Sequence, residues 1–224
     1  IGLAAYQNKD FKTATTYAQM AAQDPAKAKE ANEIVLFAAK DAATTKADSV
    51  AYLNILKKFH ADEPSEQRYF NLLMEYYSKA GDQEQMLKWV EEEISIAPNN
   101  KMPWALKGEA LMNARKWDEA IEAYKKSAEL DPTVVQVIFN AGVCYNSKAI
   151  ELKDQLADKT TGGLTKANAE KVKAVLVEAQ KLLERAKELD PTRSSVNWAY
   201  PLYQIYYAIG NKEKSAEMEA LLNN

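Results

Sequence analysis

Residues 116–132 read KWDEAIEAYKKSAELDP, which is the pattern of one amphipathic helix that ends at a proline. Four residues fall on the same side of that helix, at spacings of three and four: Ala120, Tyr124, Ser127 and Ala128. A helix that had to fill a core by itself would carry Leu or Ile at these positions. The small side chains therefore predict a neighbouring helix that comes very close.

The pattern of a helix that ends at a proline recurs along the chain. Between residues 70 and 98, one apolar stripe leads to Gly81, which can take the left-handed cap conformation, and a second stripe starts at Met86. The second-helix positions Ala51, Met86 and Ala120 are 35 and 34 residues apart. A period near 34 is typical of a solenoid of helix pairs, whereas the period-two alternation of strands is absent from the sequence.

These repeats resemble tetratricopeptide repeats (TPR). The stretch 103–132 is the best copy, because five residues fall at the spacing of that family: Trp104, Gly108, Ala120, Tyr124 and Pro132. Two positions depart from the motif, with Lys107 in place of the usual Leu and Leu111 in place of the usual Tyr. Weaker copies cover nearly the whole chain. The resemblance implies an all-α fold, a right-handed solenoid of antiparallel helix pairs, with about six pairs and a truncated first one. We expect it to form a single domain over residues 1–224.

The resemblance also gives a reason for the small residues in the opening stretch. Gly108 and Ala120 would let the two helices of one pair approach closely. Ser127 and Ala128 would make room for the first helix of the next pair. Each pair then stabilises its neighbours, because no single pair can bury both of its faces.

The fifth pair is longer than the others. Ala120 and Ala179 are 59 residues apart, which is 25 more than one period of 34. The extra residues surround the sequence KTTGGLTKAN at 159–168. We predict an inserted helical hairpin over 148–172, made of two elongated antiparallel helices. Its turn would contain the two adjacent glycines, and Thr165 would cap the second helix.

The charge balance argues against a nucleic-acid-binding protein. The 224 residues carry 29 basic and 32 acidic side chains, for a formal net charge of −3. Nucleic-acid binders usually show a basic excess. No apolar run reaches the roughly 18 residues that a membrane-spanning helix needs, so no membrane-spanning segment is expected.

No catalytic, metal or cofactor site is predicted, and we expect that the protein is not an enzyme. Such a site needs a convergent set of titrating or ligating residues. The only histidine, His60, falls at a helix end, where the helix dipole accounts for it. The only cysteine, Cys144, is expected to be a small core residue. The sequence TTGGLTK lacks the spacing of a phosphate-binding loop.

The resemblance implies a binding groove, because the first helices of successive TPR pairs line a concave surface where peptides and proteins bind. The partner would be an unidentified protein or peptide. A carboxylate clamp for acidic tails is incomplete here, since no Lys/Arg pair follows in register. Phe139, Tyr200 and Tyr207 are expected to be exposed aromatic anchors. The groove residues carried over by register are Arg68, Asn71, Glu75, Met102, Glu109, Met112, Gln136, Phe139, Val143, Asn146, Asn197, Tyr200, Gln204 and Tyr207.

Two alternatives to the adaptor interpretation stay open. One is a structural protein that forms a homodimer through the inserted hairpin or through the C-terminal edge, SAEMEALLNN. The other is a non-catalytic subunit of a larger bacterial complex. The Lys-rich, Arg-poor composition and the start at Ile1 favour a bacterial protein exported to the periplasm, with the cytoplasm as the alternative location.

Overall fold

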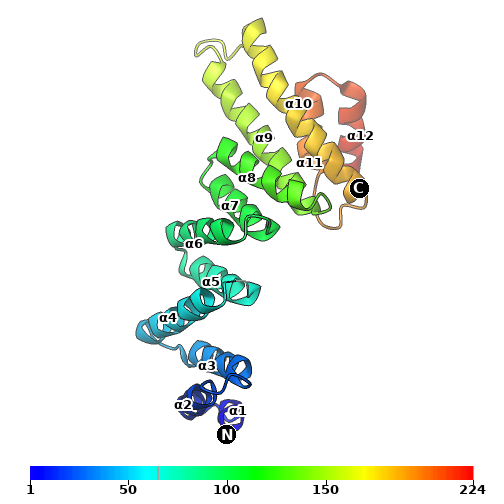
Figure 1. The fold of residues 1–224 in the computed structure, drawn as a ribbon. Coiled ribbons are helices and arrows are strands. Elements are labelled where there is room, and N and C mark those ends of the chain that lie inside the picture. The colour runs from blue at the N-terminus through cyan, green and yellow to red at the C-terminus, as the bar shows by residue number, and fades with distance from the viewer. Residues whose placement is uncertain (65, 224) are drawn as a thin grey trace. The chain divides into compact units, whose positions relative to one another are not determined.

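The chain is built from helices that follow one another closely (Figure 1). The computed structural model describes residues 1–64 and 66–223, without the side chain of residue 83, and no strand occurs in this part of the chain. The expected all-α fold of consecutive helix pairs is confirmed. The helices are α1 (Gly2–Gln7), α2 (Phe11–Ala21), α3 (Ala28–Ala42), α4 (Lys46–Asp62), α5 (Gln67–Ala80), α6 (Gln83–Ile96), α7 (Lys101–Asn113), α8 (Trp117–Leu130), α9 (Val135–Leu156), α10 (Lys166–Leu189), α11 (Ala199–Ala208) and α12 (Lys212–Leu222).

The chain divides into two compact units, Ile1–Trp89 and Val90–Asn224, with the boundary inside α6. In the first unit, α1 packs on α2, α2 on α3, α3 on α4 and α4 on α5. In the second unit, the same sequential packing joins α7 through α12. From α1 to α5 and from α7 to α12, each helix thus contacts its neighbours in sequence, as a repeat fold requires. A single domain over residues 1–224 stays a prediction.

Local sequence signals set the helix ends. Gly81 ends α5 with φ +67°, and the Asp82 side chain accepts a hydrogen bond from the Gln85 N–H at 3.1 Å, so it caps α6. Both roles follow from ordinary capping chemistry. Thr45 and Asp48 form a capping box at the start of α4, in which each side chain accepts from the other residue's backbone N–H.

The close approach expected in the pair α7–α8 is present. A Cβ atom added to Gly108 would lie 2.7 Å from Cδ1 of the Tyr124 ring, which is closer than real Cβ contacts allow. Ala120 is fully buried in the same place. The expectation for Ser127 is wrong, because its hydroxyl donates to the Lys101 carbonyl at 2.9 Å. Ser127 therefore faces the first helix of its own pair.

The elongated hairpin is the most distinctive part of the second unit. α9 and α10 pack along each other and extend past α11 and α12 (Figure 1). Thr165 accepts from the Asn168 N–H at 3.2 Å and so caps α10 as expected. Gly162 takes φ +69° in the connecting turn, where the Asp158 carboxylate accepts from the Thr161 N–H at 2.7 Å.

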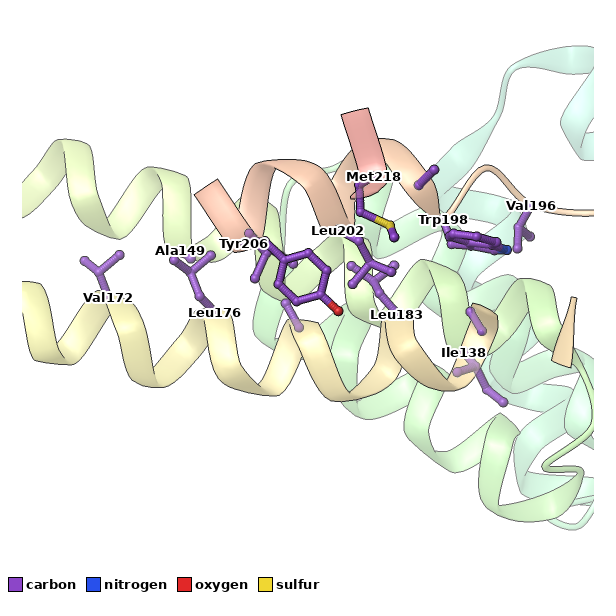
Figure 2. Close-up of a cluster of buried hydrophobic side chains, with 14 residues drawn as sticks. Ile138, Ala149, Val172, Leu176, Leu183, Val196, Trp198, Leu202, Tyr206 and Met218 are labelled. Atoms are coloured by element: carbon purple, nitrogen blue, oxygen red, sulfur yellow. The ribbon is translucent and has the colours of Figure 1, made fainter. Parts of the chain in front are cut away.

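A hydrophobic cluster joins α9 and α10 to the last helix pair (Figure 2). Leu183 and Leu202 are fully buried at its centre, and Trp198 is 2% exposed. A Cβ atom on Gly142 of α9 would lie 2.7 Å from Leu183 Cγ, so this helix also approaches its partner closely. Met218 of α12 is 1% exposed, and this helix covers the cluster from its outer side.

The connection between α10 and α11 is organised by one carboxylate. Asp190 accepts hydrogen bonds from the backbone N–H groups of Ser194, Ser195 and Val196 at 2.8–3.0 Å. These bonds, the one from Val196 foremost, lower the pKa of Asp190 to about 2. The Asp190 carbonyl also accepts from Trp198 Nε1 at 2.7 Å. The chain is thereby held so that α11 begins at Ala199, which places Pro201 in the first turn, where its missing N–H costs nothing.

Candidate protein-binding surface

The first helices of the second unit, α7, α9 and α11, lie in sequence against one another. A hydrogen bond from Asn146 Nδ2 on α9 to Gln204 Oε1 on α11, 3.1 Å long, fixes the register of these two helices. Gln204 Nε2 in turn donates to the Tyr200 hydroxyl at 3.2 Å. Residues predicted as groove-lining on two different helices are thus brought together. We call the side of α7, α9 and α11 that carries them the first-helix face.

Three apolar side chains of α7 and α11 stand out because they are exposed. Tyr207 is 73% exposed, Tyr200 53% and Met102 45%. The Tyr207 ring rests beside Tyr203, with ring centroids 6.2 Å apart. Large exposed side chains of these types are the residues that most often anchor interfaces.

Two expectations about this face need correction. Phe139 is not an exposed aromatic, because it packs with Val143 against the hydrophobic cluster and is half-buried. Asn146 is only 6% exposed, and its side-chain amide donates a hydrogen bond to Gln204. Both positions face the groove side in the sequence pattern, but Asn146 meets α11 and Phe139 packs on the cluster beneath the surface. Tyr200 and Tyr207 remain the exposed aromatic side chains of this face.

The polar residues at the other end of α9 form a small network. Gln136 donates to Asn140 at 2.9 Å, and Asn140 donates to the Tyr124 hydroxyl at 3.2 Å. Burial raises the pKa of Tyr124, so this phenol stays neutral and serves as a fixed hydrogen-bonding group. Met112 is half-buried with its sulfur 4.0 Å from the same hydroxyl. Gln136 itself is exposed, as is Glu109 on α7.

Asn197 is placed differently from the expectation. It lies in the connection that precedes α11, and not on a first helix, although its side chain is exposed. The cause is the late start of α11 that Asp190 and Pro201 impose.

The three predicted residues of the first unit lie on α5. Arg68 pairs with Glu33 of α3 at 2.6 Å, and Glu75 accepts from Lys79 at 2.6 Å and from Lys40 at 3.0 Å. The hydrogen bonds from Lys79 and Lys40 lower the pKa of Glu75. Arg68 and Glu75 are thus already engaged with the neighbouring helix, while Asn71 is exposed. A groove continuous from these residues to those of α7, α9 and α11 stays a prediction.

A hollow lies beside the first-helix face, and no sequence pattern predicted it. We call this hollow the hairpin notch. It measures about 430 Å³ and lies where α9 and α10 continue past α11. Ala149, Val172 and Leu176 form its apolar base, and Ile150 and Tyr207 stand at its mouth. Its charged lining residues are Lys153, Glu170 and Lys173.

Groups with reactive chemistry lie away from this surface or are buried. Cys144 is fully buried, and desolvation raises the pKa of its thiol to about 12. His60 is 2% exposed in the last turn of α4 and meets the edge of Trp89 at 5.9 Å between ring centroids. Across residues 1–64 and 66–223, no group of three or more His, Cys, Asp or Glu side chains is arranged to hold a metal ion. In the same residues, no helix is long and apolar enough to cross a membrane.

Helices packed consecutively in pairs, with apolar side chains exposed on the first helices, are the architecture of a helical-repeat protein. Comparison with known proteins identifies the repeat. Residues 103–134 match the tetratricopeptide repeat family model. The peroxisomal targeting signal receptor of Candida albicans is 34% identical over 70 residues, which are 29% of this chain and 12% of that protein. The chain thus spans about an eighth of that relative's length.

Solved structures show the same fold. The human IFIT1 dimer with m7Gppp-AAAA has a TM-score of 0.57 and 21% identity over 96% of this chain and 46% of that one. The crystal structure of MamA has a TM-score of 0.57 and 13% identity over 77% of this chain and 85% of that one. Residues 103–134 thus carry a tetratricopeptide repeat, within a chain that shares the helix-pair fold of these solved structures. Tetratricopeptide repeats are typically non-catalytic scaffolds for protein or peptide partners.

Proposed function

We propose that the second unit binds a segment of another polypeptide along its first-helix face, and that the protein acts as a non-enzymatic adaptor. The observation that carries this proposal is the exposure of Met102, Tyr200 and Tyr207 on first helices of the second unit. An interface draws much of its affinity from a few large side chains of these types.

The buried residues beneath the face support the same proposal. Asn146, Gln204 and Tyr200 form a chain of hydrogen bonds that holds the tyrosine ring in one place. A fixed anchor loses less conformational entropy when a partner binds. The face also offers the exposed polar side chains of Glu109 and Gln136, which can hydrogen-bond to a peptide backbone.

The proposal is tested by retention of partners from an extract of the source cells. The test variant is Met102→Ala with Tyr200→Ala. The matched control is Met20→Ala with Tyr17→Ala, which removes one exposed Met and one exposed Tyr from the first unit, at 61% and 42% exposure. Each truncated anchor is expected to weaken binding by roughly 1–3 kcal/mol.

The outcome is read by quantitative mass spectrometry, after circular dichroism has shown that both variants keep their helix content. Proteins held by the unmodified chain should be lost from the test variant and kept by the control. Equal loss from both variants, or equal retention by both, would show that the first-helix face is not the binding surface. Sedimentation of the same samples tests the homodimer, which stays an alternative. The larger complex and the bacterial, periplasmic origin also stay alternatives.

A further inference from the structure

We infer that the hairpin notch binds an acidic polypeptide segment that carries one bulky apolar side chain. This inference rests on the proposed function and names the chemistry of the partner. It follows from three features of the notch, which are its position, its apolar base and the charges around it.

The notch continues the first-helix face. On α9, Asn146, Ile150 and Lys153 follow one another at spacings of four and three residues, so they lie on one stripe of the helix. Asn146 meets α11, but Ile150 and Lys153 lie beyond the end of that helix and line the notch. A segment bound along the first-helix face therefore reaches the notch next to Tyr207.

The base of the notch suits an apolar side chain. Ala149, Val172 and Leu176 belong to the hydrophobic cluster, and each is at most 7% exposed. The hollow of about 430 Å³ falls within the size of ordinary ligand pockets, roughly 300–1,000 Å³. Ile150 is 47% exposed at its mouth, so a bound side chain would remove apolar surface from water on two sides.

The charges around the notch suit an acidic segment. Residues 152–173 carry five lysines and three acids, although the whole chain is net negative. Among the residues that the structure describes, none of these five forms an ion pair: Lys153, Lys159, Lys166, Lys171 and Lys173. Just before them, Lys148 pairs with Asp118 and Arg115 pairs with Glu151.

One of the three acids is held in the turn by the backbone. The Asp158 carboxylate accepts hydrogen bonds from the backbone N–H groups of Thr160 and Thr161 at 3.0 and 2.7 Å, and it forms no ion pair with these lysines. Five lysines against three acids therefore leave a positive excess around the notch for a partner. Such charges raise the association rate and select acidic sequences more than they add affinity.

A peptide fits these features better than an anionic membrane does. The apolar surface is recessed between three helices, whereas a membrane-binding element carries its apolar side chains on the outer face of a helix. The exposed tip of the hairpin, residues 158–161, consists of Asp, Lys and Thr.

The test selects a random peptide library against the complete chain, with Lys153→Glu, Lys173→Glu as the counter-selected variant. The matched control is Lys12→Glu, Lys212→Glu, which makes the same charge change at two exposed lysines that do not line the notch. Enriched peptides should carry several Asp or Glu around one Phe, Leu or Trp. By fluorescence anisotropy, the notch variant should bind the enriched peptide about tenfold more weakly, and the control within about twofold.

Three results would overturn the inference: a selection without acidic enrichment, equal binding by both charge variants, or a stronger response to phosphatidylserine vesicles than to the peptide. Ile150→Ser should also weaken the peptide about fivefold, because it removes apolar surface at the mouth of the notch. Failure of this inference is distinct from failure of the proposed function. If Met102→Ala, Tyr200→Ala releases the cellular partners and the lysine variant keeps them, only the notch assignment is wrong.

Discussion

Replacing Gly108 by Ala should destabilise the second unit, although Ala is the better helix former. The new Cβ atom would lie 2.7 Å from Cδ1, 2.8 Å from Cγ and 2.8 Å from Cε1 of Tyr124. The ring has little room to move away, since Tyr124 is 1% exposed and its hydroxyl is held by Asn140. The helices must separate, or the ring must leave its preferred position.

Two opposing effects set the magnitude. Ala in place of Gly within a helix stabilises by roughly 1 kcal/mol. Overpacking of a well-filled contact costs roughly 1–3 kcal/mol, and three ring atoms at these distances place the cost in the upper part of that range. We therefore expect a net loss of about 1–2 kcal/mol in the free energy of unfolding.

Urea unfolding followed by tryptophan fluorescence measures this loss. Three of the four tryptophans, Trp104, Trp117 and Trp198, belong to the second unit, so the signal reports mainly on it. A double-mutant cycle with Tyr124→Leu isolates the contact, because the narrower side chain leaves room for the new Cβ. The coupling energy should be about 1–3 kcal/mol.

A Gly108→Ala variant that is about 1 kcal/mol more stable than the unmodified chain would refute this reasoning. It would mean that the ring or the helices yield without cost and that only the helix propensity remains.

Three further predictions concern the interior of the second unit. Asp190→Asn should lower the urea midpoint, because it removes the carboxylate that accepts from Val196 and Ser195. Folding lowers the pKa of Asp190, so in the unmodified chain its contribution to stability should be complete above pH 3.8 and be lost as the pH falls to about 2. Acid titration of both proteins should therefore show a shallower fall of the unfolding free energy for the variant. Leu183→Ala should cost about 2–5 kcal/mol by urea unfolding, because the side chain is fully buried. Cys144 should react with a thiol reagent at neutral pH only after denaturation, because it is buried with a raised pKa, and rapid labelling of the native chain would contradict its position.

The parts of the fold that depend on single residues or on spacing were predictable from the sequence. Gly81 and Asp82 mark a helix end and the next start by local chemistry alone. The excess of 25 residues over one period was enough to predict the elongated hairpin and its cap at Thr165. Each of these signals acts within a few residues of its effect, or along the period of the repeat.

For most residues of the candidate surface, the helix that carries them was predictable from the sequence, but their exposure was not. A repeat register places Asn146 and Phe139 on the groove side of α9, yet it says nothing about how far α11 reaches over them. The role of Asp190 was missed for a similar reason. Its three backbone partners depend on the path of an irregular connection, which has no periodic pattern to read.

The ion pairs of the first unit have a mechanical consequence. Glu33 with Arg68 and Lys40 with Glu75 join the same two helices, α3 and α5, and on each helix the paired residues are seven positions apart. Seven residues of helix measure about 10 Å. Exposed pairs of this kind add little to the free energy of folding. Two ion pairs at that separation nevertheless resist rotation of α3 relative to α5. A single ion pair would leave the two helices free to rotate about it. Removing either ion pair should therefore leave the melting temperature nearly unchanged while lowering the torsional stiffness between α3 and α5.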